Sequence, residues 1–152
     1  MCFHSRPRII IDKKRGYYYI KIDDIECRIS KREIMKHIAT LPYDEEIISL
    51  DDVLTNKYYI LHVLIELCLL QSMGYKVGEQ TFKEVEPEDL WRAHLKALDI
   101  ELRYAVKDGD KDWVLKRLKE LEGVLENKSL SDEVREEILL LLNKWFYFEE
   151  KD

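Results

Sequence analysis

The sequence predicts an α+β protein that is mainly helical, with a small N-terminal antiparallel β-meander packed on a bundle of four to five helices. Two observations lead to this prediction. Residues 8–29 hold short runs rich in Ile and Tyr between polar turns, a pattern typical of a meander. Residues 50–148 carry long apolar patterns with helical spacing, separated by short breaks. A third observation, the charge of the chain, changes sign between the same two regions.

The meander is predicted from three strand-length runs, at residues 8–12, 17–22 and 25–29. Side chains alternate between the two faces of a strand, so Tyr17 and Tyr19 share one face of the middle run, while its other face is apolar. A bare three-stranded sheet is only marginally stable, and we therefore expect helices to cover the apolar face.

The first helix is predicted to start at Ser30, because Glu33 three residues later completes a capping box. It is expected to stop near Thr40, since Pro42 disfavours helical geometry in the residue before it. Residues 42–49 are predicted to be a connector.

The second helix is predicted over residues 50–73, ending at Gly74. Its centre, residues 58–70, is apolar almost all round, so we expect it to be the buried central helix. The same apolar run contains His62 and Glu66 and is too short to cross a membrane.

Three further helices are predicted over residues 87–107, 111–126 and 131–148, after a loop or poor hairpin at 75–85. Pro87 suits a first helical position, because its missing N–H has no partner there in any case. The connections between these helices are short, which favours antiparallel neighbours.

The chain is predicted to form one domain over residues 1–152, with a basic meander and short helix at 1–41 and an acidic helical bundle at 42–152. Residues 1–39 hold 10 Lys and Arg against 5 Asp and Glu, while the remainder holds 15 against 26. This asymmetry indicates a charged partner for the basic end, within the molecule or outside it.

Composition predicts a protein of a thermophile cytoplasm. Gln and Asn are scarce while Glu, Lys and Ile are abundant, as in proteins selected for heat resistance. No secretory apolar segment follows Met1, because charges begin at Arg6. The three cysteines form no CxxC pair and are expected to be ordinary thiols, with a Cys2–Cys27 disulfide as the alternative.

The candidate metal ligands are His62, Glu66, His94 and Glu101. His62 and Glu66 are four residues apart and share one face of the most buried helix. His94 and Glu101 are seven residues apart on one side of the 87–107 helix, so packing of the two helices would gather all four. Such a set suits zinc or iron. The alternative is a buried hydrogen-bonded pair with a structural role.

The candidate nucleic-acid contacts lie in the basic meander and are interleaved with tyrosines. Cations bind phosphate, and aromatic rings stack on exposed bases. The competing interpretation has the same cations paired with the acidic bundle. The candidate residues are Arg8, Lys13, Lys14, Arg15, Lys21 and Arg28.

The sequence contains no GxGxxG, P-loop, GxSxG or HExxH motif and no kinase element. We therefore expect a non-catalytic interaction or assembly module without a cofactor, contacting a protein partner, a second copy or nucleic acid but no membrane. The alternative is an enzyme or metal-binding protein built on His62, Glu66, His94 and Glu101.

Overall fold

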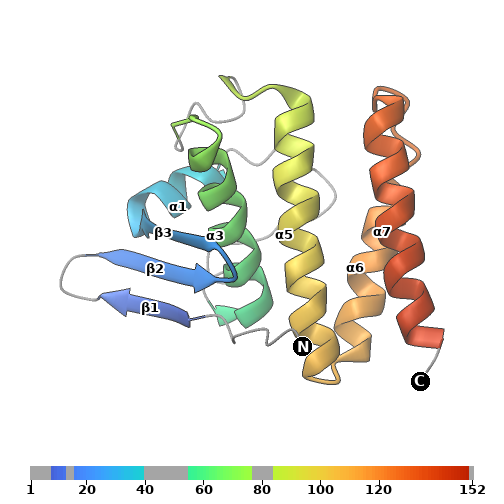
Figure 1. Ribbon diagram of the computed structural model, residues 1–152, viewed down its shortest axis with the longest axis horizontal. Helices are drawn as coiled ribbons and strands as arrows, with labels where there is room; N and C mark the ends of the chain where they lie inside the picture. The colour runs from blue at the N-terminus through green and yellow to red at the C-terminus, as the bar shows by residue number, and fades with distance from the viewer. Residues whose placement is uncertain (1–7, 13–15, 40–54, 77–83, 151–152) are drawn as a thin grey trace.

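The computed structural model describes residues 8–12, 16–39, 55–76 and 84–150. A three-stranded sheet lies against helices α1 and α3, α5 forms the next layer, and α6 and α7 cover the far side of α5 (Figure 1). This arrangement confirms the predicted α+β, mainly α, fold class. The elements are β1 (Arg8–Asp12), β2 (Tyr17–Ile22), β3 (Ile25–Ser30), α1 (Lys31–Ala39), α3 (Lys57–Ser72), α5 (Pro87–Lys107), α6 (Lys111–Val124) and α7 (Asp132–Glu150).

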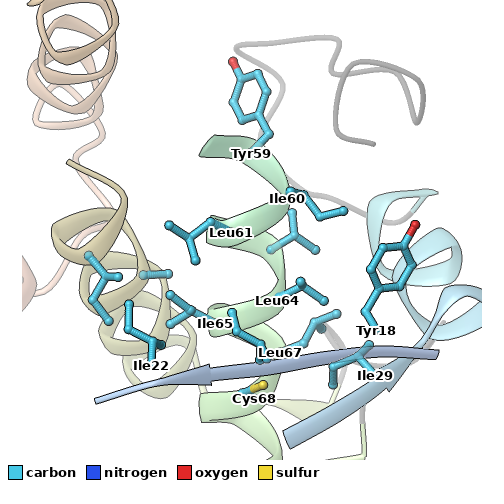
Figure 2. Packing of buried hydrophobic residues seen from close by; sticks show 14 of the residues in the cluster. Tyr18, Ile22, Ile29, Tyr59, Ile60, Leu61, Leu64, Ile65, Leu67 and Cys68 are labelled. Carbon is cyan, nitrogen blue, oxygen red and sulfur yellow. The ribbon is translucent and has the colours of Figure 1, made fainter. Parts of the chain in front are cut away.

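The sheet is the predicted meander, antiparallel in the order β1-β2-β3. Its inner face buries Tyr18, Ile20 and Ile22 of β2 with Ile29 of β3. These side chains meet the apolar face of α3, as Figure 2 shows for Tyr18, Ile22 and Ile29. The sheet therefore obtains from α3 the apolar cover that it needs for stability.

Helix α1 follows β3 directly and begins as predicted. The backbone N–H of Glu33 donates to Ser30 Oγ over 3.0 Å, and the Ser30 hydroxyl donates to Glu33 Oε1 over 3.0 Å. The second bond differs from the usual capping box, in which the glutamate side chain accepts from the backbone N–H of the capping serine rather than from its hydroxyl.

Helix α3 begins at Lys57, after Asn56, whose side-chain oxygen accepts from the N–H groups of Tyr58 and Tyr59. The prediction of one continuous helix from residue 50 is wrong, because the backbone of Asn56 is extended and this residue caps a helix that starts after it. Residues 50–54 lie outside the described residues. The predicted end is confirmed, because α3 closes before Gly74, which has a φ of 97° that favours glycine. Twelve of its residues are buried, so it is the central helix that its sequence predicts.

Helix α5 spans the predicted residues but is buried on two faces rather than along one seam. The predicted seam, which includes Leu95, Leu98 and Leu102, packs against α6 and α7. A second face with Ala97 and Ile100 packs in the core shared with α3. Small residues such as Ala97 allow the two helices to approach closely, which brings their polar side chains together.

A disulfide between Cys27 and Cys68 joins β3 to α3, with Cα atoms 5.9 Å apart. The prediction of three ordinary thiols is therefore wrong for these two residues. The alternative pairing of Cys27 with Cys2 is wrong as well, and Cys2 lies outside the described residues. The physical reason is that the packing of α3 on the sheet brings Cys68 within bonding reach of Cys27.

Helix α7 carries the apolar run that the sequence predicted, but only part of it is buried. Ile138 and Leu142 lie in the core, while Leu139 and Leu140 are 54% and 65% exposed. Among the described residues, no helix has the length and hydropathy needed to span a bilayer.

Candidate metal centre

Helix α3 places two ionisable side chains inside the protein. Burying such groups is unfavourable unless they are paired, and here the pairing is local. His62 and Glu66 are 5% and 2% exposed, and His62 Nε2 lies 3.0 Å from Glu66 Oε2. The i,i+4 relation predicted from the sequence thus places both groups on the face of α3 that meets α5.

Helix α5 brings the third and fourth predicted residues to the same place. His94 Nδ1 lies 3.1 Å from His62 Nε2 and 3.3 Å from Glu66 Oε2. Glu101, two turns further along α5, is fully buried, and its Oε1 lies 2.9 Å from His62 Nδ1. All four predicted residues are therefore gathered between α3 and α5, with His62 between the two carboxylates.

Three donor atoms form a triangle with edges of 3.0, 3.1 and 3.3 Å: His62 Nε2, Glu66 Oε2 and His94 Nδ1. A zinc ion bound through nitrogen and oxygen at ~2.0–2.1 Å in tetrahedral geometry separates its ligand atoms by about 3.3 Å. The triangle therefore has the size of one face of a metal coordination shell. Glu101 lies behind His62 and is not part of the triangle.

The surroundings of His62 disfavour a neutral, metal-free ring. A neutral imidazole carries one N–H, but both ring nitrogens of His62 lie within 3.0 Å of a carboxylate oxygen. One nitrogen lone pair would then face an oxygen lone pair. Burial alone lowers the pKa of His62, but Glu101 and Glu66 more than offset this and raise its pKa above the usual value. A second proton or a metal ion on His62 removes the conflict.

The Glu101 end of the cluster is held by fixed donors from α6. Arg117 Nε and Nη2 donate to Glu101 over 2.8 and 3.1 Å, and Trp113 Nε1 donates over 2.7 Å. Burial raises the pKa of Glu101, but Arg117 and His62 outweigh it and lower that pKa to about 2. The contact between His62 Nδ1 and Glu101 lacks hydrogen-bond alignment, so it is mainly electrostatic.

The Glu66 end is surrounded by histidines. Burial again raises the pKa of Glu66, yet the contacts with His37, His62 and His94 hold it well below the usual range. Burial lowers the pKa of His94, against the pull of Glu66. The side chain of His94 is 16% exposed, more than those of His62 and Glu66, so His94 is the member of the triangle most accessible to solvent, and its ring packs edge-on against Trp91.

Charge within the cluster favours an added cation. Glu66 and Glu101 are the two carboxylates that contact His62. The Arg117 guanidinium donates to Glu101 and offsets its negative charge. Among the described residues, the ion-pair partners of Glu66 are histidines, so a metal ion in the triangle would offset the negative charge of Glu66.

Sequence reasoning missed His37 and Arg117. His37 is fully buried, and its Nε2 lies 3.7 Å from Glu66 Oε1. It stands three residues after the buried Ile34, and Arg117 stands three residues after the buried Val114. Both residues interrupt an apolar pattern with helical spacing, and this pattern is the sequence signal that could have identified them.

The predicted nucleic-acid residues that the structure describes lie in the sheet, apart from this cluster. Lys21 and Arg28 are exposed on the sheet face that points away from α3, and Arg8 pairs with Lys21 in the strand register. Lys13, Lys14 and Arg15 lie outside the described residues.

Comparisons with known proteins assign no role to this cluster. Comparisons with protein-family models, with curated proteins and with solved structures gave no match.

Proposed function

We propose that the protein binds one divalent transition-metal ion, zinc by preference, through His62 Nε2, Glu66 Oε2 and His94 Nδ1. The observation that carries this proposal is the triangle of donor atoms at coordination spacing, in a largely buried place. Imidazole and carboxylate donors suit both zinc and iron(II). Zinc is favoured because a tetrahedral ion needs only one further ligand, such as water, where an octahedral ion needs three.

Glu101 supports the proposal from behind His62. A ligating histidine usually directs its second ring nitrogen at a carboxylate or carbonyl, which fixes the ring and makes it more basic. Here Glu101 Oε1 lies 2.9 Å from His62 Nδ1 without hydrogen-bond alignment, so Glu101 acts on the ring through its charge, and Arg117 with Trp113 hold that carboxylate in place. Because these donors engage Glu101, it is poorly suited to act as a general base. We therefore propose a metal that ties α3 to α5 rather than a hydrolytic centre.

The test is metal analysis of protein purified from zinc- and iron-supplemented culture, followed by zinc titration of the stripped protein. We expect about one equivalent of zinc, and its loss in His62→Ala and His94→Ala. Val63→Ala is the matched control, because Val63 is a buried neighbour in α3 without a metal donor. Folded wild-type protein that binds neither zinc nor iron would refute the proposal.

A second candidate function is an interaction module that binds single-stranded nucleic acid on the outer sheet face. Tyr17 is 39% exposed, and Tyr19 shares its face with Lys21 and Arg28. One specific observation favours this reading over internal pairing. Neither Lys21 nor Arg28 forms an ion pair with another described residue. The ion pair of Asp23 with Arg103 places the acidic residue on the meander and the basic residue on the bundle, which is the reverse of the predicted charge pairing.

Fluorescence anisotropy with labelled single-stranded RNA and DNA at several salt concentrations tests this candidate. Loss of two phosphate contacts in Lys21→Ala/Arg28→Ala should reduce the log–log salt slope by about 1.4. Lys96→Ala, which removes an exposed cation on α5, is the control. No binding at low salt, with a change of association state in the double variant instead, would favour a protein partner or a second copy.

We also propose a thermophile cytoplasm as the setting. The scarcity of Gln and Asn supports it, and so does the Cys27–Cys68 disulfide, since intracellular disulfides are common in hyperthermophiles. A thermal midpoint above about 65 °C is expected, because mesophile domains cluster below that value. A midpoint inside the mesophile range would count against this setting.

A further inference from the structure

The second oxygen of Glu66 faces a residue outside the donor triangle. Oε2 lies against His62 and His94, whereas Oε1 points toward His37, whose Nε2 is 3.7 Å away. Among the described residues, no hydrogen bond reaches this buried Oε1. A carboxylate that binds a metal through one oxygen is oriented by what holds its other oxygen, so the neighbour of Oε1 affects the centre.

The position of His37 is fixed by helix α1 and by the contacts of that helix with α3. It is fully buried in α1, the helix that continues directly from β3 and lies next to α3 (Figure 1). The Ser30–Glu33 cap fixes the first turn of α1, and Gln71 Nε2 of α3 donates to Glu33 Oε2 over 3.4 Å. The imidazole therefore reaches Glu66 from an element that carries no donor of the triangle.

We propose that His37 is a positioning residue of the metal centre, donating its Nε2–H to Glu66 Oε1 and thereby holding Glu66 as a one-oxygen ligand. This inference rests on the proposed metal function. An N–H···O bond is about 2.9–3.0 Å long, so the present contact must shorten by about 0.7 Å when the ion draws Glu66 into place. His37 is not itself a ligand of that ion, because the group of donor atoms within 4.8 Å of one another comprises His62, Glu66 and His94.

Two substitutions separate the hydrogen bond from the packing of the ring. His37→Phe keeps a buried ring without a donor, and His37→Gln keeps an N–H donor without the ring. Ile34→Ala is the control, because Ile34 is a fully buried residue one turn earlier in α1 whose side chain carries no hydrogen-bond donor. Circular dichroism establishes that each full-length variant is folded before titration.

The experiment is titration of the stripped protein with zinc and with cobalt(II), whose visible absorption reports coordination geometry. His37→Phe should weaken zinc binding about 10- to 100-fold and alter the cobalt spectrum, as loss of an outer hydrogen bond typically does. His37→Gln should recover most of the affinity and the wild-type spectrum. Ile34→Ala should bind as the wild type does.

Each contrary outcome is distinct. Wild-type affinity and spectrum in His37→Phe would overturn the role of His37 while leaving the metal centre intact. A fall from two bound cobalt ions to one would make His37 a ligand of a second ion, which also overturns the inference. A wild-type protein that binds neither zinc nor cobalt would remove the proposed function itself, and the inference with it.

Discussion

Glu66 and Glu101 are both buried carboxylates in neighbouring helices, yet the protein neutralises them in opposite ways. Glu101 accepts three hydrogen bonds from Arg117 and Trp113, donors that keep their protons at any physiological pH. Within the described part of the chain, the polar contacts of Glu66 are with three histidines, His62, His94 and His37. His62 touches both carboxylates and joins the two ends.

The difference separates a permanent pairing from an exchangeable one. A guanidinium cannot be deprotonated in a protein, so the Glu101 end has one state. Histidines gain and lose protons near neutral pH and also bind metals, so the Glu66 end can exchange its positive partner. Four substitutions or titrations test this distinction, from the largest expected effect to the smallest.

The largest loss of stability is expected from Glu101→Gln. This change leaves the Arg117 guanidinium, 9% exposed, without its main carboxylate. Breaking a buried pair in this way typically costs about 3–5 kcal/mol, because the remaining charge is uncompensated. Urea unfolding of the metal-free protein measures the effect. A loss below 1 kcal/mol would show that Glu120 alone suffices for Arg117.

A smaller loss is expected from the matched change Glu66→Gln. The partners of Glu66 are histidines, which release a proton instead of remaining charged and unpaired. The remaining cost is that of altered buried hydrogen bonds, about 1–3 kcal/mol. The same urea experiment compares the two variants directly. Equal losses would contradict the distinction between permanent and exchangeable partners.

The pH dependence of His62 should reverse sign when zinc is added. Its pKa is raised in the folded state, so without metal its contribution is fully present below pH 6.5 and is lost as the pH rises through the folded pKa. Zinc replaces the proton, so stabilisation by zinc should grow over the same interval. Each unit of pKa displacement corresponds to about 1.4 kcal/mol.

Thermal unfolding between pH 5 and 9, with and without zinc, measures this reversal. His62→Gln is the control, because it removes His62 and keeps the other titrating groups of the cluster. The pKa of His94 is lowered, so its contribution to stability changes with pH in the opposite sense to that of His62. The pKa values of Glu66 and Glu101 lie below this pH interval. If the wild type and His62→Gln show the same pH dependence, His62 is not the titrating group.

Local signals in the sequence predicted most of the helices and strands and the four residues His62, Glu66, His94 and Glu101, but not how these four residues contact one another. Pro87 and Gly74 mark helix ends that the structure confirms, and the i,i+4 spacing of His62 and Glu66 predicted their common face. Spacing within one helix cannot reveal how two helices align. The sequence therefore could not tell that His94 meets Glu66 while Glu101 meets the other side of His62.

The residues that sequence reasoning missed depend on three-dimensional packing. His37 and Arg117 reach the cluster from α1 and α6, which are separated in the sequence by residues 40–110. The Cys27–Cys68 disulfide was missed for the same reason, because its partners are 41 residues apart and meet only when α3 packs on the sheet. Tertiary contacts of this kind carry no periodic signal along the chain.

The smallest effect is expected at a pair of fixed charges near the surface. Lys144 Nζ lies 2.8 Å from Asp99 Oδ1, but these side chains are 48% and 26% exposed. Lys144→Ala should cost about 0–1 kcal/mol in urea unfolding, because water solvates both charges in either state and Trp145 Nε1 still donates to Asp99. Like Glu101 with Arg117, this is a pair of two charged groups, but it is exposed. A small loss here would therefore show that the large loss in Glu101→Gln depends on burial as well as on charge pairing. A loss as large as that of Glu101→Gln would instead make pairing alone sufficient, and the contrast between the two ends of the cluster would then need another cause.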